Sequence, residues 1–156
     1  MQVFLLRHGQ AASHSESGRD EDRPLTDEGR EQIAALAKSL AAKKIVFNAI
    51  WTSPYRRARE TVAVLREQLG SAPEARECLE LGSGTSFEEV ATLVESYRKE
   101  NPQAHLLLVG HMPDFGEIAA LLLGTRAALD FKPGALFRFA LPSSFARGKG
   151  KLDPIP

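Results

Sequence analysis

The sequence has a single cysteine, Cys78, among its 156 residues. One cysteine cannot form an internal disulfide framework, and we interpret it as a small core side chain in a reducing compartment. Long apolar runs are also missing: no stretch approaches the roughly 18 residues of a membrane span, and the apolar residues 3–6 are too few for the core of a signal peptide. We therefore expect a cytoplasmic protein with no membrane partner.

Net charge is missing as well, because 20 Lys and Arg are balanced by 20 Asp and Glu. Without an overall field to attract polyanions, we expect no nucleic-acid partner, and any anion site has to be built locally. A chain with 43% hydrophobic and 26% charged residues has the composition of one globular domain. We predict a single domain at residues 1–145 and, because Lys, Gly and Pro dominate thereafter, a flexible tail at residues 146–156.

Short apolar runs alternate with segments of helical periodicity along the chain. The runs predict strands at residues 3–6, 45–51, 77–81, 106–109 and 136–141. Helices are predicted between them, after Thr26 as N-cap, with Pro54 in the first turn of the next, after a Ser86–Glu89 capping box and from Pro113. This alternation predicts an α/β fold, a three-layer sandwich with a largely parallel central sheet and helices on both faces.

Basic side chains follow three of the predicted strands. Arg7 and His8 follow the first strand, Arg56 and Arg57 open the helix after the second, and His111 follows the most apolar strand. Ligands of open α/β sheets bind outside the carboxyl ends of the strands, so these residues are expected to converge. Guanidinium groups fit phosphoryl oxygens, and a neutral imidazole is a competent nucleophile toward phosphorus. Each residue alone also suits a solvated surface position, so the pattern by itself predicts an anion-binding α/β domain.

Four motifs resemble the signature of the histidine phosphatase superfamily, which is also called phosphoglycerate mutase-like. In chain order they are Leu6-Arg7-His8-Gly9, Pro24-Leu25-Thr26-Asp27-Glu28-Gly29, Ser53-Pro54-Tyr55-Arg56-Arg57-Ala58 with Thr61, and Val109-Gly110-His111. An Arg-His-Gly triplet alone is a weak signal, whereas four motifs in register over nearly the whole chain are specific. The resemblance implies a phosphoglycerate mutase-like fold and a phosphatase that needs neither a metal nor another cofactor.

The resemblance also implies roles for individual residues. His8 would be the nucleophile that becomes phosphorylated, while Arg7, Arg57 and His111 would hold the phosphoryl oxygens. Arg57 is chosen over Arg56 because the arginine of the family pattern directly precedes the alanine. A carboxylate after the third strand often donates a proton to the leaving group, which favours Glu80 over the second candidate, Glu77. Glu80 could instead orient an arginine by pairing with it.

The short chain has no room for the long insertions that cover the site in mutases and in many small-molecule phosphatases. It therefore resembles the SixA-like phosphohistidine phosphatases, whose partners are phosphorylated proteins such as histidine-containing phosphotransfer domains. A small phosphate ester is the alternative substrate. Ser13-His14 stands where mutases tend to carry Trp-Asn, so His14 either faces the substrate or is a solvated loop residue.

Three other classes of protein fit this sequence less well than a phosphatase. A module that binds phosphoproteins without turnover remains an alternative, although it would have no use for a nucleophile. A nucleotide-binding domain is disfavoured because no strand is followed by a Gly-x-Gly-x-x-Gly or Walker-type pattern. A zinc site is disfavoured because the four histidines lack a metal-ligand spacing and no second cysteine is present.

Overall fold

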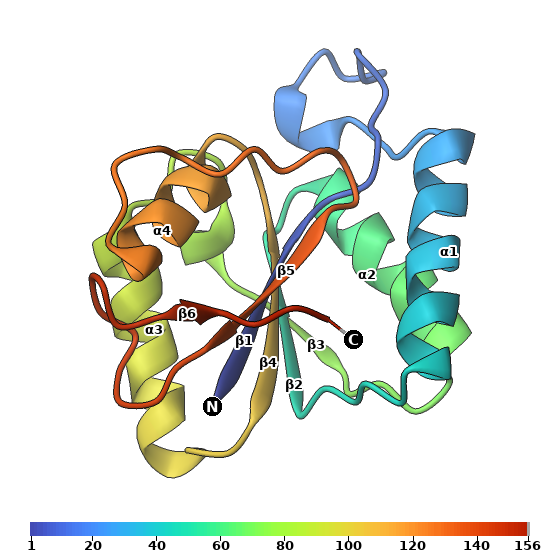
Figure 1. The fold of residues 1–156 in the computed structure, drawn as a ribbon. Helices are drawn as coiled ribbons and strands as arrows, with labels where there is room; N and C mark the ends of the chain where they lie inside the picture. Colours follow the sequence, from blue (N-terminus) through green and yellow to red (C-terminus); the bar gives the residue numbers. More distant parts are fainter. Residues whose placement is uncertain (156) are drawn as a thin grey trace.

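A mixed sheet forms the centre of the computed structural model, which describes residues 1–155 (Figure 1). Within that range the sheet has six strands in the order β3-β2-β4-β1-β5-β6. The strands are β1 (Gln2–Arg7), β2 (Ala49–Thr52), β3 (Ala75–Glu77), β4 (His105–Gly110), β5 (Leu136–Ala140) and β6 (Lys151–Leu152). Neighbours among β1 to β4 are parallel, whereas β5 runs antiparallel to β1, and β6 antiparallel to β5.

Helices cover both faces of the sheet, which confirms the predicted α/β sandwich. Figure 1 shows α1 (Asp27–Ala42) and α2 (Arg56–Leu69) on one side and α3 (Phe87–Glu100) and α4 (Asp114–Leu123) on the other. Successive side chains of a strand point to opposite faces. Accordingly, Val3 and Leu5 belong to the core under α3 and α4, while Phe4 and Leu6 belong to the core under α1 and α2. A strand buried on both faces explains the unbroken apolar run at residues 3–6.

The helix starts follow the predicted capping chemistry. The backbone N–H of Gly29 donates to Thr26 Oγ1 at 3.0 Å, so Thr26 is the N-cap of α1. The capping box of α3 is complete, with Ser86 and Glu89 exchanging side-chain and backbone hydrogen bonds. Helix α2 begins at Arg56 with Tyr55 as its N-cap, so Pro54 precedes the helix and does not lie in its first turn as predicted. Both polar caps satisfy N–H groups that a helix leaves without an internal partner.

Two predicted strands differ from the observed ones because their partner strands end. Ala49 pairs with Leu106, next to the start of β4, and Asn48 contacts His105 through its backbone N–H and its side-chain Oδ1. Residues 45–48 therefore lie outside the strand pairing, with Ile45 and Phe47 buried. Glu77 pairs with Thr52 at the end of β2, so the chain leaves the sheet after Glu77. Residues Leu79–Leu81 form a 3-10 helix (η2) in place of the predicted strand.

The carboxyl-terminal residues also differ from the expected flexible tail. Residues Lys151–Leu152 form edge strand β6, and Gly148 and Gly150 donate backbone hydrogen bonds to Leu121 and Leu122 of α4. The glycines permit this approach, since a Cβ on Gly124 would lie 3.1 Å from the Gly148 Cα. Position 156, the last residue of the predicted tail, lies outside the described residues. Within residues 1–155, no helix combines the length and apolarity that crossing a membrane requires.

The register of the parallel strands brings three loops to the same edge. Arg7 at the end of β1 pairs with Gly110 at the end of β4, and Thr52 at the end of β2 pairs with Val109. The next residues, His8, Ser53 and His111, therefore leave the sheet side by side.

Candidate active site

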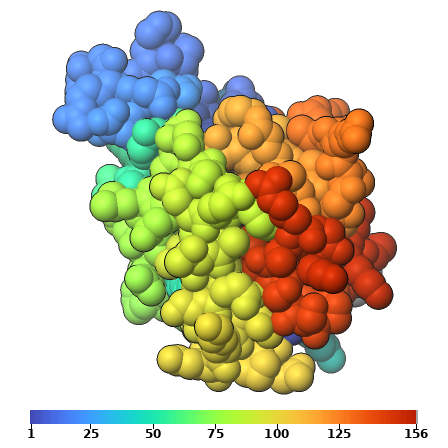
Figure 2. Space-filling model, turned by 90° about the vertical axis from the view of Figure 1, so that its left-hand side faces the viewer, coloured from blue at the N-terminus to red at the C-terminus, as the bar shows by residue number. Residues whose placement is uncertain are grey.

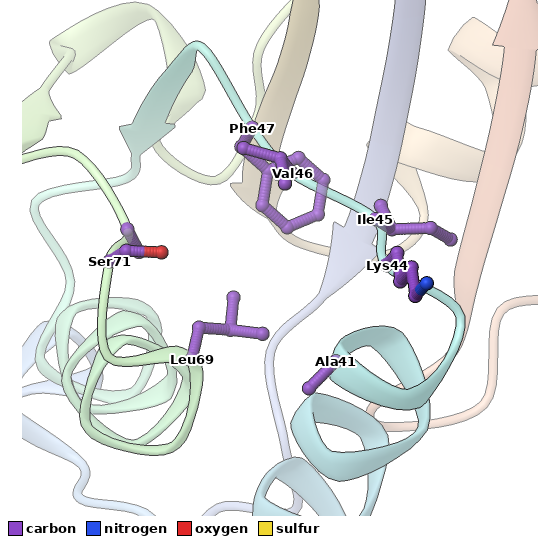
Figure 3. Close-up of a pocket in the computed structure, with 8 residues that line it drawn as sticks. Ala41, Lys44, Ile45, Val46, Phe47, Leu69 and Ser71 are labelled. Atoms are coloured by element: carbon purple, nitrogen blue, oxygen red, sulfur yellow. The ribbon is translucent and has the colours of Figure 1, made fainter.

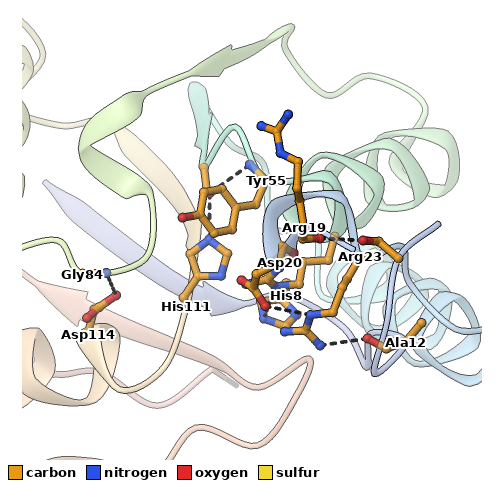
Figure 4. A network of polar contacts seen from close by, with 12 residues as sticks. His8, Ala12, Arg19, Asp20, Arg23, Tyr55, Gly84, His111 and Asp114 are labelled. Atoms are coloured by element: carbon orange, nitrogen blue, oxygen red, sulfur yellow. Dashed lines mark hydrogen bonds and ion pairs between the residues drawn. The ribbon is translucent and has the colours of Figure 1, made fainter. Parts of the chain in front are cut away.

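A polar pocket lies at this carboxyl edge (Figure 4). Its volume is about 220 Å³. The lining consists of Arg7, His8, Gln10, Ala11, Arg23, Arg57, His111, Met112 and Pro133. Four of the five residues that the sequence nominated for the site thus come together, from β1, α2 and the loop after β4. The lining is strongly basic, with three arginines and two histidines around one hollow.

His8 presents one particular nitrogen to the pocket. Its Nδ1 lies 2.7 Å from the Gly9 carbonyl oxygen, which can only accept, so Nδ1 carries the proton and Nε2 carries a lone pair. Arg57 Nε–H donates to that Nε2 at 3.2 Å, in agreement with this tautomer. Burial lowers the pKa of His8 from 6.5 to about 4, and the charges of Arg57, Arg7 and Arg23 act in the same direction. At neutral pH, His8 is therefore an uncharged imidazole whose electron pair at Nε2 accepts only the hydrogen bond from Arg57.

His111 forms the opposite wall, with its ring centroid 5.2 Å from that of His8. The ring is buried, and its Nε2 lies 2.7 Å from Ser53 Oγ. Burial lowers the pKa of His111 from 6.5 to about 3, with repulsion from His8 and Arg57 as smaller causes. The free site thus holds two neutral histidines among cationic arginines, and an anion between them would be compensated by the surrounding charge.

Arg57 and Arg56 point in different directions from the first turn of α2. Arg57 is only 4% exposed and lines the pocket, whereas Arg56 is exposed and its Nε–H donates to Glu60 at 2.8 Å. Successive residues of a helix are about 100° apart, so one of two adjacent arginines faces outward. Thr61, one turn further along α2, accepts from Gly9 N–H at 3.1 Å and donates to the Arg57 carbonyl at 2.7 Å. This hydroxyl fixes the loop after β1 against the helix that carries Arg57.

Arg7 completes the cationic lining from the end of β1. One terminal nitrogen donates to the Phe131 carbonyl at 2.6 Å, and the buried Nε has no hydrogen-bond partner in residues 1–155. Burial lowers the pKa of the guanidinium, with Asp130 opposing the shift. A guanidinium stays charged in proteins, so Arg7 supplies positive charge and unused donors to the pocket.

The profile of the histidine phosphatase superfamily (branch 1) matches residues 3–103, which include the first three of the four motifs. The chain belongs to the histidine phosphatase superfamily.

Similar proteins narrow the branch of the superfamily. The chain is 37% identical over 121 residues to an uncharacterised protein of Picosynechococcus, covering 76% of this chain and 71% of the relative. It is 28% identical over 144 residues to the phosphohistidine phosphatase SixA of Escherichia coli, covering 92% and 88% of the two chains. A structure of the protein histidine phosphatase SixA complexed with tungstate superposes with a TM-score of 0.88 and 27% identity, covering 98% and 94%. This histidine phosphatase is accordingly SixA-like, as the short chain without long insertions predicted.

Two polar residues of this phosphatase site were missed in the sequence. Asp20, in a 3-10 helix at Asp20–Asp22 (η1), accepts from Arg57 through its carbonyl at 2.7 Å and its carboxylate at 3.0 Å. The same carboxylate accepts from Arg23 Nε at 2.8 Å, and Arg23 lines the pocket. Both residues belong to the polar loop before α1, the blue segment that projects from the body of the molecule in Figure 2. Arg23 directly precedes the Pro24-Leu25-Thr26 motif, a position that could have signalled it.

Glu80 lies apart from the residues that line the phosphatase pocket. It is an exposed residue of η2, and within residues 1–155 its carboxylate forms no ion pair, so it does not orient an arginine in this structure. Its backbone carbonyl accepts a hydrogen bond from Thr85 Oγ1. Glu77 is 3.7 Å from Arg59 on the outside of α2. His14 is exposed and lines a neighbouring polar hollow with Arg19, Asp20 and Arg23.

A larger hollow, of about 290 Å³, lies at the opposite end of the sheet of this phosphatase (Figure 3). Ala41, Ile45, Val46, Phe47 and Leu69 give it a mainly apolar wall. It offers one lysine and no histidine or arginine, so it lacks the groups that phosphoryl chemistry requires. Within residues 1–155, no group of three or more His, Cys, Asp and Glu side chains is arranged to hold a metal ion.

Proposed function

We propose that this histidine phosphatase removes phosphoryl groups from phosphohistidine in proteins, through a covalent intermediate on Nε2 of His8. The observation that carries the proposal is the tautomer of His8. Its Nδ1–H is committed to the Gly9 carbonyl, and a lone pair on Nε2 faces the basic pocket. A neutral imidazole in that orientation is an activated nucleophile, since no proton has to leave before the attack.

The first step transfers the phosphoryl group between two imidazoles. His8 Nε2 forms a bond to phosphorus while the bond between phosphorus and the substrate's nitrogen breaks. The leaving imidazole, already protonated on its other nitrogen, keeps both electrons of the broken bond and departs neutral. Arg57 Nε–H donates to His8 Nε2 at 3.2 Å in the free site, and it would donate to a phosphoryl oxygen instead when the substrate binds. Arg7 and His111 would bind the remaining oxygens, so positioning and charge neutralisation provide most of the catalysis.

In the second step, water attacks the phosphorus of phosphorylated His8. The P–N bond breaks, inorganic phosphate leaves, and Nε2 recovers its lone pair. Glu80 receives no step in this proposal, because it does not line the pocket. A phosphohistidine substrate suits a site without a carboxylic acid, since an imidazole that is already protonated leaves easily. A phosphate ester would gain more from a general acid, whose help is worth about 10²–10⁴ in rate.

The shape of the site supports a protein as substrate. Within the described part of the chain, no residue between Arg57 and His111 lines the pocket, so nothing from α3 or η2 covers it. The SixA relatives are named as phosphohistidine phosphatases, and one was solved with tungstate, a tetrahedral oxyanion like phosphate. We extend that substrate class to this chain, with a histidine-containing phosphotransfer domain as the partner, and we place the reaction in the cytoplasm.

Rapid-quench labelling with a phosphohistidine protein tests the covalent step. Wild type should yield a phosphoryl label that is labile in acid and stable in base, as expected for a P–N bond. His8→Ala should lose both the label and turnover, His111→Ala should turn over slowly and still be labelled, and His14→Ala, which alters an exposed loop histidine, should behave as wild type. Turnover of wild type without any trapped label at short quench times would mean direct attack by water and would refute the intermediate.

The substrate class needs its own comparison. We expect the highest kcat/KM for a phosphorylated phosphotransfer domain, and lower values for phosphoserine peptides, phosphotyrosine peptides and small sugar phosphates. A sugar phosphate as the best substrate would overturn the substrate class but leave His8 as the nucleophile. Binding of every phosphorylated ligand without turnover would instead indicate a phosphoprotein-binding module.

A further inference from the structure

Ser53 is a buried polar residue of the site to which the mechanism above gives no role. It follows β2, is fully buried, and its Oγ lies 2.7 Å from His111 Nε2. The same Oγ accepts from the backbone N–H of Tyr55 at 3.2 Å. The hydroxyl therefore has a committed donor on one side and an imidazole on the other, and the direction of the second hydrogen bond depends on where the protons are.

A count of protons decides between the two possible directions. If His111 Nε2–H donated to Ser53, the serine oxygen would accept two hydrogen bonds, and its own buried proton would have no acceptor within residues 1–155. If Ser53 donates to Nε2, the serine proton and the Nε2 lone pair are both paired, and the one group left without a partner is the Nδ1–H of His111. The first direction also leaves the buried lone pair of His111 Nδ1 unpaired, so it has two unpaired polar groups where the second has one. Unpaired buried polar groups are costly, so the second direction is preferred.

From this arrangement we infer that Ser53 is a positioning residue, which sets His111 in the tautomer that carries its proton on Nδ1. A neutral imidazole has a single N–H, so a ring that accepts at Nε2 must donate from Nδ1. His111 Nδ1 is buried and has no hydrogen-bond partner in residues 1–155. In Figure 4 it is the ring nitrogen on the side of His8, away from the dashed contact. An N–H there can donate to a phosphoryl oxygen, whereas a bare lone pair would repel it.

The two histidines of the pocket are therefore set in complementary states by different partners. The Gly9 carbonyl takes the Nδ1 proton of His8 and leaves a lone pair for attack, while Ser53 fills the Nε2 lone pair of His111 and leaves a proton for the oxyanion. The kinetic consequence of this inference rests on the proposed function, but the tautomer itself does not.

Nitrogen NMR of histidine-labelled protein at neutral pH reads the tautomer directly. The chain has only four histidines, and the signals of His111 are those that disappear in His111→Gln. Wild type should show a protonated Nδ1 and an unprotonated Nε2 at His111. Ser53→Ala should shift the proton toward Nε2, and Ser53→Thr, which keeps the hydroxyl, should restore the wild-type pattern. Thr52→Val is the matched control, because its buried hydroxyl donates to the Ser53 carbonyl and not to the ring.

Kinetics provide the second measurement. Ser53→Ala should lower kcat by about 10- to 100-fold with a smaller change in KM, below the roughly 10²–10³-fold cost of deleting an oxyanion donor outright. It should still form the His8 label. A wild-type spectrum with the proton on Nε2, or with both nitrogens protonated, would overturn the inference whatever the activity is. So would an unchanged tautomer in Ser53→Ala; if that variant does not fold, the wild-type spectrum alone decides.

Discussion

Lowering the pH through 6.5 should destabilise this protein, even before the pH is low enough for carboxylates to titrate. Burial lowers the pKa of His8 to about 4 and that of His111 to about 3, from 6.5 in each case. When a pKa is lowered by folding, the unfolded chain binds the proton first, so stability falls as the pH drops below 6.5 and continues to fall until the folded pKa is reached. The window therefore extends from about pH 6.5 to about pH 4 for His8, and further for His111.

The size of the effect follows from the number of protons taken up. Between pH 7.5 and 5.5, an unfolded histidine of pKa 6.5 gains nearly one proton that the buried histidine does not bind. One unit of pKa corresponds to 1.36 kcal/mol, so each histidine removes about 1.4 kcal/mol over this interval, and the two together about 3 kcal/mol. That loss is a large share of the roughly 5–15 kcal/mol that stabilises a typical domain.

Urea unfolding at both pH values measures this loss. His8→Asn and His111→Gln keep a hydrogen-bonding atom near Nδ1 and Nε2 respectively but do not titrate, so each should remove about half of the histidine-dependent loss, and the double variant nearly all of it. Comparing variants with wild type cancels contributions from other groups. Saturating phosphate should also reduce the loss, since an anion in the pocket favours the protonated imidazoles. An equal pH dependence in wild type and the double variant would refute the neutral, buried state of both histidines.

Three further predictions concern individual residues, and a fourth concerns metal dependence. Arg57→Ala should weaken inhibition by vanadate about 10- to 100-fold, as expected for loss of a charged hydrogen bond of roughly 1.5–3 kcal/mol, whereas Arg56→Ala should change it less than about twofold; the reverse order would show that Arg56 faces the site. Gly110→Ala should cost about 1–3 kcal/mol in urea unfolding, because its Cβ would lie 2.6 Å from Phe115, and an unchanged midpoint would contradict that packing. Glu80→Gln should leave phosphohistidine turnover within about threefold, and a loss near 10² would restore Glu80 as proton donor. A chelator should not affect hydrolysis of a generic phosphate ester; a loss that added metal reverses would contradict a metal-independent reaction.

Much of the candidate site could be predicted because each residue stands at a fixed offset from a strand end. A strand buried on both faces has an unmistakable apolar run, so the ends of β1 and β4 were readable, and His8 and His111 follow them directly. Asp20 and Arg23 follow no strand, and only Arg23 has a local marker, its position directly before the Pro24-Leu25-Thr26 motif. They lie in a polar loop whose path depends on contacts with Arg57, and no local pattern encodes those contacts.

The strand boundaries show where local patterns stop being informative. Residues 45–51 are apolar enough for one long strand, but strand pairing begins only at Ala49, because the backbone N–H of His105, the first residue of β4, donates to the side-chain Oδ1 of Asn48. The reversed direction of β5 and the pairing of β6 likewise depend on which edge of the sheet is still free when the chain returns to it. Glycine-rich residues 146–150 read as a tail, although the same glycines let the backbone lie close against α4.

By itself the sequence determined the alternation of strands and helices, the two-sided burial of the central strands, and the basic residues at their carboxyl ends. Periodicity, capping and charge are properties of neighbouring residues, so they are legible without coordinates. Only the tertiary structure decided which nitrogen of each histidine faces the pocket, that Ser53 and Gly9 are their partners, and that Glu80 lies outside the pocket lining. These properties depend on hydrogen bonds between segments distant in the chain and on the burial of the side chains involved. Both depend on atomic positions to within a few tenths of an ångström, which are set only when the sheet has assembled.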